Sequence, residues 1–198
     1  MENQRLERQL AFCREMDKEK LIGRQTYLAD GSRKENDAEH AWHMALMALL
    51  LAEHANQPVD LLRVVAMLLV HDLVEVDAGD TFAYDAAAAV GKEERERAAA
   101  DRIFAILPPD QGAYLRGLWD EFEACTTPEA KFAHTMDNFQ PAMLNDASDG
   151  KSWVEHGVAL SQILRRNART AEGSRVLWDY SRQHFIQPHV DAGHIKDE

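Results

Sequence analysis

The stretch "LLVHDLVEVDAGD", residues 68–80, decides how the rest of the chain is interpreted. An apolar helix, predicted from about residue 61, leads into it and meets His71 and Asp72. Glu75 follows Asp72 by three residues, so it lies on the same side of a helix, one turn further on. An imidazole and several carboxylates at the end of a core helix gain nothing in packing, and the stretch therefore indicates a cation-binding site. A helix end that simply turns polar is the structural alternative.

The composition predicts one soluble globular domain. The chain has 198 residues, of which 45% are hydrophobic and 28% charged, and this length can bury a core without disulfides. Its two cysteines, Cys13 and Cys125, form no disulfide framework or metal-binding pattern, which fits a reducing cytoplasm. The first residues lack a signal-peptide core, and the apolar runs are shorter than the about 20 residues that span a bilayer. We expect a cytoplasmic protein that does not enter a membrane.

The net charge limits the ligands that the protein can bind. It is −12, from 22 basic and 34 acidic residues. Polymeric nucleic acid and anionic membranes both need a basic surface, so neither is an expected partner. A small anionic ligand stays possible if a metal ion or a few local arginines offset the field of the protein.

Helical periodicity predicts an all-α protein. It recurs along almost the whole chain, whereas sustained alternation with a period of two is missing. Asp60, and Thr127 before Pro128, are typical residues for helix starts. We expect a single domain over 1–187 and a polar tail over 188–198 that is a candidate for disorder. The predicted helices span residues 3–20, 37–55, 60–76, 91–107, 110–125, 128–147, 152–168 and 174–187.

Spacing along the helices limits which histidines can join His71. His40 and His43 lie three residues apart on one helix face, and the spacing alone does not choose between them. His54 lies about 21 Å from His40 along the helix axis, so one ion cannot bind both. Three more histidines fall in the last helix and the polar tail and are poor candidates for a precise site: His184, His189 and His194.

Asp137 is the fourth candidate ligand. It lies beside the stripe of Phe132, Met136 and Phe139, which is predicted to be buried, and a carboxylate there is costly unless it meets a cation or strong donors. His134 is the local alternative partner, and a hydrogen-bonded structural Asp137 fits the pattern as well as a ligand does. Two imidazoles and two carboxylates would suit Mn²⁺, Fe²⁺, Co²⁺, Ni²⁺ or Zn²⁺ and leave coordination positions open for hydrolysis.

The order His, His-Asp, Asp, with the pair in mid-chain on a buried helix, resembles the HD-domain metal-dependent phosphohydrolases. Four blocks are similar to consecutive blocks of their 5′-deoxynucleotidase group: "LIGRQTYL" (21–28), "RKENDAEHAWHMA" (33–45), "MLLVHDLVEVDAGD" (67–80) and "EAKFAHTMDNFQPAML" (129–144). The resemblance extends over about residues 5–165. It implies an all-helical HD-domain bundle with a metal site between buried helices, and an enzyme that removes phosphate from deoxyribonucleoside 5′-monophosphates.

The resemblance also assigns metal ligands. The first histidine of the family follows a glutamate, as in "AEH", which selects His40 over His43. The implied ligands are then His40, His71, Asp72 and Asp137. The ion is divalent, and the candidates are Mn, Co, Fe, Ni, Zn and Mg.

Catalytic and substrate-binding residues follow from the same blocks. Glu75 and Asp80 match acidic residues that handle the nucleophilic water or help to hold a second ion. Arg24 matches an arginine that holds the substrate phosphate, and Arg33 matches an arginine that is either structural or phosphate-facing. Gln25 departs from the pattern, because well-known bacterial members have an aromatic residue there that packs on the deoxyribose. We therefore expect weaker discrimination between deoxyribose and ribose than is usual in the family.

Three functions remain in competition. The leading one is hydrolysis of nucleoside 5′-monophosphates. The second is another HD-type hydrolysis, of phosphodiesters or nucleoside triphosphates, and the third is a non-catalytic module that binds a nucleotide.

His43 is additional to the family pattern. We interpret it as a partner of His40 or as a substrate contact. A small nucleotide is the expected ligand, and we also expect a homodimer.

Overall fold

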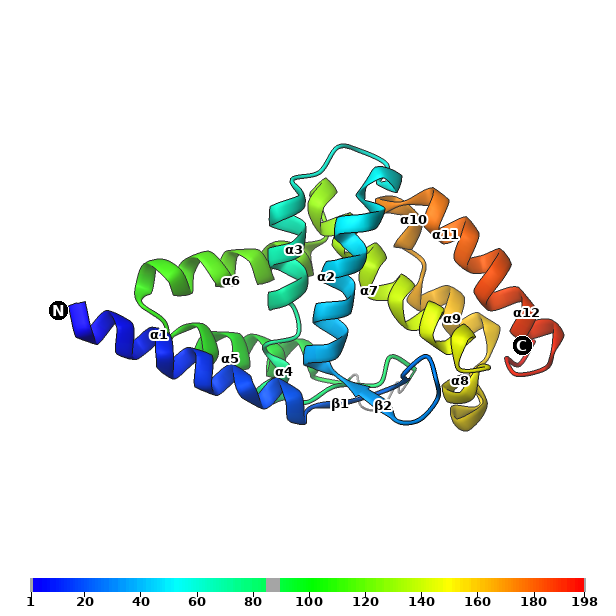
Figure 1. Cartoon of the computed structure of the whole chain (residues 1–198), viewed down its shortest axis with the longest axis horizontal. Helices are drawn as coiled ribbons and strands as arrows, with labels where there is room; N and C mark the ends of the chain where they lie inside the picture. Colours follow the sequence, from blue (N-terminus) through cyan, green and yellow to red (C-terminus); the bar gives the residue numbers. More distant parts are fainter. Residues whose placement is uncertain (1, 85–89, 198) are drawn as a thin grey trace.

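The computed structural model describes residues 2–84 and 90–197 and is largely helical (Figure 1), which confirms the prediction of an all-α fold. The α-helices are α1 (Glu2–Met16), α2 (Asp37–Leu51), α3 (Leu61–Val70), α4 (Glu75–Ala78), α5 (Lys92–Phe104), α6 (Pro109–Ala124), α7 (Pro128–Ala147), α8 (Lys151–His156), α9 (Leu160–Arg166), α10 (Thr170–Gly173), α11 (Arg175–Ser181) and α12 (Gln187–Asp191). Other elements are the 3₁₀ turns η1 (Asp17–Leu21) and η2 (Ala52–His54), the π-helical turn η3 (Arg182–Ile186), and the strands β1 (Gly23–Tyr27) and β2 (Lys34–Asn36).

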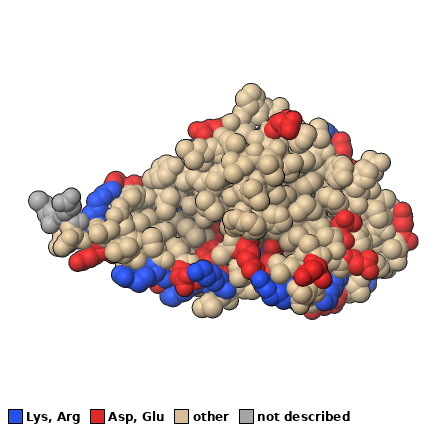
Figure 2. All heavy atoms as spheres, viewed as in Figure 1, with Lys and Arg blue, Asp and Glu red and all other residues tan. Residues whose placement is uncertain are grey.

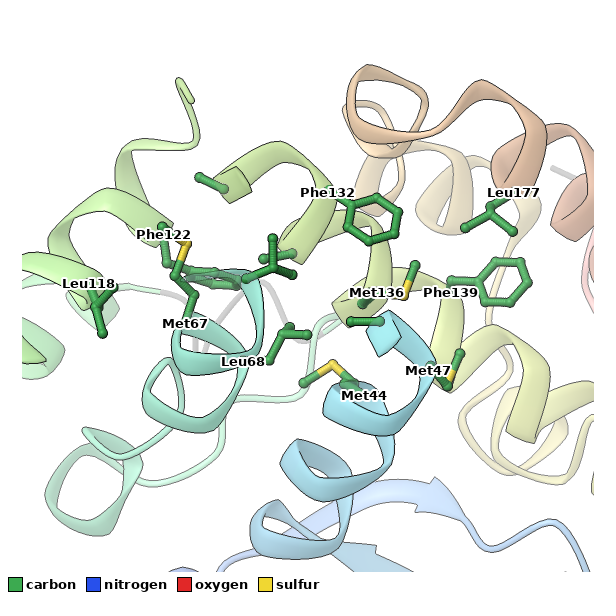
Figure 3. Close-up of a cluster of buried hydrophobic side chains, with 14 residues drawn as sticks. Met44, Met47, Met67, Leu68, Leu118, Phe122, Phe132, Met136, Phe139 and Leu177 are labelled. Carbon is green, nitrogen blue, oxygen red and sulfur yellow. The ribbon is translucent and has the colours of Figure 1, made fainter. Parts of the chain in front are cut away.

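The main core lies where α2, α3 and α7 pack against one another. In Figure 3 the labelled side chains of these three helices point into one shared interior. Each helix contributes apolar residues of its inner face, and these are fully buried: Met44, Ala48, Val64, Leu68, Phe132 and Met136. The three helices that carry the predicted metal ligands are therefore held rigidly by apolar packing.

Side-chain caps fix where these helices begin. Asp60 accepts a hydrogen bond from the backbone N–H of Arg63 at the start of α3, and Thr127 caps α7 in the same way. Both predicted starts are confirmed. At α2, Asn36 and Glu39 form a reciprocal capping box, so the chain enters this helix at a defined angle just before His40.

A short antiparallel hairpin was not expected from the sequence. β1 pairs with β2, with Gly23 opposite Asn36 and Tyr27 opposite Lys34. These strands are shorter than the window over which alternation becomes visible, so periodicity gave no signal. The hairpin leads directly into α2 and brings Arg24 toward the site.

Two predicted helices are interrupted. The helix expected over 60–76 ends at Val70, and turn bonds such as Glu75 N–H to the Asp72 carbonyl (2.8 Å) reorient the chain before α4 begins. The helix expected over 152–168 is divided into α8 and α9 at Gly157, which has a φ of 58°. Apolar residues continue through the first break, so hydrophobic pattern alone could not locate it.

The C-terminal segment is ordered, contrary to the expectation of a polar tail that could be disordered. It continues through η3 into α12, and Ile195 is 1% exposed in an apolar cluster, separate from the main core, that includes Trp153 and Trp178. The backbone N–H of Lys196 donates to the Val158 carbonyl (3.0 Å). Within the described residues, no helix combines the length and hydropathy that a membrane span requires.

Candidate metal centre and substrate cavity

Three helices bring the four predicted metal ligands to one place. His40 projects from α2, His71 and Asp72 follow the end of α3, and Asp137 projects from α7. His71 Nε2 lies 2.9 Å from Asp72 Oδ2, and His40 Nε2 lies 3.3 Å from Asp137 Oδ1 and 4.0 Å from Asp72 Oδ2. Asp137 Oδ1 is also 3.9 Å from His71 Nε2. All four side chains are at least 87% buried.

The second nitrogen of each imidazole has a fixed partner. His40 Nδ1 is 2.9 Å from Gln140 Oε1, and His71 Nδ1 is 3.0 Å from the Leu68 carbonyl oxygen. Both partners are acceptors, so each Nδ1 carries the proton and donates it. The Nε2 atoms then face the carboxylates and are the ones left to bind an ion, which is the arrangement typical of metal-binding histidines.

The protonation behaviour of the group reflects burial and mutual charge. Burial, with a smaller effect of Arg24, lowers the pKa of His40 to about 4, so this imidazole is neutral. Burial also acts to lower the pKa of His71, but Asp72 and Asp137 outweigh it and raise the value to about 9. A proton on His71 Nε2 therefore balances the two carboxylates, and a divalent cation would replace it.

The donor set fits a divalent metal ion. Ligand atoms of His40, His71 and Asp72 all lie within 4.8 Å of one another, and Asp137 Oδ1 adds a fourth donor beside the two imidazoles. His71 Nε2 is buried yet forms no hydrogen bond of acceptable geometry within the described residues, despite its proximity to Asp72. Mixed imidazole and carboxylate donors suit first-row divalent metals better than thiophilic ones.

Two arginines donate to the carboxylate ligands, Arg166 to the outer oxygen of Asp137 and Arg24 to the Asp72 oxygen that also faces the imidazoles. Arg166 of α9 donates to Asp137 Oδ2 (2.7 Å), and Arg24 of β1 donates to Asp72 Oδ2 (3.1 Å) and to Asp37 Oδ1 (3.2 Å). Burial acts to raise the pKa of Asp137, but Arg166 and the imidazoles hold it well below its usual range. Both ligands therefore remain ionised.

Glu75 and Asp80 line the same cavity as His71 and Asp72. Glu75 is 4% exposed, and its Oε2 has no hydrogen-bond partner within the described residues. Burial, followed by the charges of Asp72, Asp37 and Asp80, raises the pKa of Glu75 to about 11. Burial also raises the pKa of Asp80. The carboxyl of Glu75 is thus protonated until a cation enters.

The cavity wall combines polar and aromatic side chains. The cavity has a volume of about 330 Å³, which lies within the range of small-molecule sites. Phe82, Tyr84 and Trp153 line it, and the Phe82 and Tyr84 rings meet edge to face at 5.2 Å. Lys92 and Arg166 add positive charge to the wall.

The remaining predicted residues differ in their placement. Gln25 lines the cavity, where its Oε1 accepts from Lys34 Nζ (2.6 Å). Arg33 lies outside the cavity lining and donates to Glu39 Oε2 (2.8 Å) of the capping box, so its position fits the structural alternative. His43 Nδ1 is 3.3 Å from Gln140 Nε2, which links it to His40 through one amide and favours the partner role.

Sequence reasoning missed several buried polar residues around the site. Gln140 is fully buried and connects His40 to Glu35, which accepts from its Nε2 at 2.9 Å. Asp37 is also fully buried and shares Arg24 with Asp72. These residues lie within the quoted blocks "RKENDAEH" and "NFQPAML", so the signal was present there. Arg166 and Lys92 lie outside those blocks, and no spacing pointed to them.

The chain belongs to the HD domain family, because the family model described as "HD domain" matches residues 16–178. A crystal structure of a predicted metal-dependent phosphohydrolase from Magnetospirillum magnetotacticum MS-1 is similar over nearly its whole length. The two sequences are 48% identical, the TM-score is 0.92, and the match covers 98% of this chain and 96% of that one. The fold and the class of metal-dependent phosphohydrolases agree with the geometry of the site.

Curated relatives with a specific activity are also similar. The 5′-deoxynucleotidase HDDC2 of Bos taurus is 33% identical over 142 residues, 71% of this chain and 66% of that protein. The Homo sapiens 5′-deoxynucleotidase HDDC2 is 34% identical over 125 residues, 63% of this chain and 58% of that protein. The match thus spans less than two thirds of the length of either relative.

Proposed function

We propose that this protein is a metal-dependent phosphohydrolase that removes phosphate from nucleoside 5′-monophosphates. The observation that carries the proposal is the position of Arg24, whose guanidinium touches the metal-site carboxylate Asp72 inside a cavity lined by acidic groups. A phosphate is the ligand that such a cation and an adjacent metal site would bind together. The activity named for the bovine and human relatives supports the same substrate class.

The metal and the protein have separate tasks in this reaction. A divalent ion held by His40, His71, Asp72 and Asp137 would supply an activated water and offset the charge of the phosphoryl oxygens. Arg24 binds and orients the phosphate through its planar guanidinium. Arg166 keeps the carboxylate of Asp137 ionised and oriented through its hydrogen bond to Oδ2.

Glu75 has the role of general acid or base. Its buried carboxyl has a raised pKa, so it changes protonation readily when a cation enters or a charge develops beside it. It takes a proton from the attacking water or gives one to the leaving 5′-oxygen. Asp80, on the same cavity wall, orients the water or helps to hold a second ion.

The aromatic part of the cavity wall fits the nucleoside part of such a substrate. Phe82, Tyr84 and Trp153 offer apolar ring surfaces to the cavity. Bases of all kinds stack on aromatic side chains, so these rings favour a nucleotide over a simple phosphate ester without selecting one base.

A phosphate-release screen tests the proposal. The purified protein is assayed with nucleoside mono-, di- and triphosphates, 3′-monophosphates, a phosphodiester and an aryl phosphate, each with Mn²⁺, Co²⁺, Fe²⁺, Ni²⁺, Zn²⁺ or Mg²⁺. We expect release from 5′-monophosphates and little from 3′-monophosphates. Because Gln25 stands where an aromatic residue is usual, the preference for deoxyribose over ribose should be weak.

Controls separate this function from its alternatives. Asp72→Ala should lose both the bound metal and the activity, because it removes the carboxylate that lies 2.9 Å from His71 Nε2. Preferential hydrolysis of triphosphates or phosphodiesters would replace the proposal by another HD-type reaction. Nucleotide binding without turnover under every metal would favour the non-catalytic module.

We also propose that the protein forms a homodimer through the outer face of α2 and α3. Large apolar side chains gather on these two adjacent helices and are exposed in the single chain: Trp42, Leu46, Leu49, Leu50, Leu62 and Leu69. Figure 2 shows this face as a wide region without charged residues, where Figure 1 places the two helices. An exposed apolar face of this kind is typical of an interface, and its chemistry is complementary to itself in a twofold dimer.

Sedimentation equilibrium tests the dimer. Leu49→Glu places a charge in the middle of the face and should give a monomer, whereas Val176→Glu, at an exposed apolar position on α11, should leave the dimer intact. A monomeric wild-type protein would contradict the proposal.

We further propose a cytoplasmic location, because Cys13 and Cys125 are both free thiols, and cell fractionation tests it.

A further inference from the structure

A second group of metal-ligating side chains lies outside the catalytic cavity. Asp149 is in the turn between α7 and α8, His189 is in α12, and His194 is in the segment that follows it. His189 Nδ1 lies 2.9 Å from His194 Nδ1, and His194 Nδ1 lies 3.8 Å from Asp149 Oδ1. The three ligand atoms all lie within 4.8 Å of one another.

The other nitrogen of His189 is already engaged. His189 Nε2 lies 3.2 Å from Asp146 Oδ1, so it carries a proton and donates it to this carboxylate. The lone pair of His189 is therefore on Nδ1 and points at the group formed by His194 and Asp149. A carboxylate behind a histidine in this way orients the ring and increases its basicity, and it accompanies most metal-binding histidines.

We propose that His189, His194 and Asp149 form a second divalent-metal site of the zinc class, with Asp146 supporting His189. In tetrahedral coordination with bonds of about 2.0–2.1 Å, neighbouring donor atoms are separated by about 3.3 Å. The observed separations of 2.9 Å and 3.8 Å lie on either side of this value. Asp149 is 90% exposed, so the fourth position is open to water.

The metal-free geometry shows how the ion would enter. Two Nδ1 atoms at 2.9 Å must share one proton, which His194 donates to His189. An ion takes the position between the same two nitrogens, and His194 then carries its proton on Nε2. No backbone movement is needed, because both rings already face each other.

Gly150 allows the two imidazoles to approach the turn. A Cβ at this position would lie 2.9 Å from His189 Nδ1 and 3.2 Å from His194 Nδ1, and the φ of Gly150 is 67°. Both nitrogens thus converge on a point that only glycine leaves free. The turn at Gly150 and the C-terminal segment therefore pack closely at the proposed site.

Such a site would fasten the C-terminal segment to the part of the fold that lines the cavity. Ile195, next to His194, is buried in a cluster with Trp153 and Ile163, and both of these line the substrate cavity. Metal bound at the second site therefore stabilises this cluster without contacting the catalytic ion. The site is independent of the proposed nucleotidase activity and acts on stability.

Zinc stoichiometry tests the proposal. The protein is dialysed against buffered low-micromolar Zn²⁺, and zinc per chain is measured for the wild type and for variants of each site. We expect two zinc ions in the wild type, one in Asp72→Ala, one in His194→Ala and none in the double variant. His184→Ala is the matched control, because this exposed histidine lies in the same segment outside the group, and it should keep two.

Asp149→Asn is a second variant of the proposed site that is expected to keep the fold. Asp149 has a φ of 57°, which asparagine also adopts readily, and its side chain is almost fully exposed. In the Asp72→Ala background, Zn²⁺ should raise the melting temperature, and adding Asp149→Asn should reduce that increase. Equal zinc content in His194→Ala and the wild type, or no zinc in Asp72→Ala, would show that the two histidines only share a hydrogen bond.

Discussion

The metal centre depends on single residues that never touch the ion. His40 and His71 can each present Nε2 only because an acceptor takes the proton of Nδ1, which is Gln140 Oε1 in one case and the Leu68 carbonyl in the other. The Gln140 amide is itself oriented, because its Nε2 donates to Glu35 Oε2. One buried amide therefore decides the tautomer of one ligand.

Replacing Gln140 should weaken metal binding more than catalysis. Gln140→Leu keeps the buried volume and removes the acceptor, so His40 loses the partner that fixes its tautomer. We expect the affinity for Mn²⁺ or Co²⁺ to fall roughly 10- to 100-fold, as for other partners of metal ligands. Metal titrations followed by turnover at saturating metal measure this, and turnover should largely recover. Unchanged affinity would mean that Gln140 does not orient the ligand.

Replacing Glu75 should weaken catalysis more than metal binding. Glu75→Gln keeps the shape and removes the titrating group, so the fold and the metal should remain while turnover falls roughly 10²-fold or more. Asp77→Asn is a control on the same helix, because Asp77 pairs with Arg102 away from the cavity and its loss should leave turnover near the wild-type value. Metal content and kcat are measured together. Loss of metal in Glu75→Gln would make this residue a ligand, and normal turnover would remove it from the mechanism.

At the scale of elements, the sequence predicts the long helices well and the short ones poorly. α2, α6 and α7 carry periodic apolar residues, and α7 also has the starting signal of Thr127 and Pro128, so the existence and approximate bounds of these helices follow from the sequence. The break after Val70 does not, because the turn is made by backbone hydrogen bonds within an apolar run. The predicted ligands still converge, since His71 and Asp72 lie before the chain leaves the core.

The β-hairpin, which positions Arg24, could not be predicted from the hydrophobic pattern of the sequence. Arg24 was assigned to phosphate by resemblance alone, because no periodicity indicated two short strands. In the structure, β1 inserts Arg24 between Asp37 and Asp72, and the side chain is only 13% exposed. Long-range pairing of this kind depends on tertiary packing, which a local window does not contain.

The hairpin offers a matched pair of arginines for a test. Arg24→Gln removes the cation that faces the cavity, and kcat/KM for a 5′-monophosphate should fall roughly 10- to 100-fold, since a hydrogen bond to a charged group contributes about 1.5–3 kcal/mol. Arg33→Gln removes contacts with Glu39 and with the Lys34 carbonyl, neither of which lines the cavity, and should leave kcat/KM near the wild-type value. Equal effects of both substitutions would exclude Arg24 as the phosphate-binding residue.

At the scale of the whole molecule, acidic charge is concentrated where a cation is needed. The net charge of −12 includes several buried carboxylates around the cavity, and the raised pKa values of Glu35 and Asp37 (about 7) and of Glu19 (about 8) come mainly from burial. In the unfolded chain such groups titrate near pH 4. Between about pH 4 and pH 8 these carboxyl groups therefore bind more protons in the folded, metal-free protein than in the unfolded chain.

This difference predicts how stability depends on pH and metal. Because the folded state binds more protons, the free energy of unfolding should fall as the pH rises from about 4 to 8. A divalent ion opposes this loss, and at a concentration of 100 times its Kd it adds about 2.7 kcal/mol, roughly 5–10 °C in Tm for a chain of this size. Thermal unfolding at pH 5, 6, 7 and 8, with EDTA or with Mn²⁺, measures both effects. We expect Tm to decrease with pH in EDTA, less steeply in Glu19→Gln, and to rise with Mn²⁺ in the wild type but not in Asp72→Ala. A Tm that does not change with pH in EDTA would mean that these carboxylates ionise in the folded protein without cost.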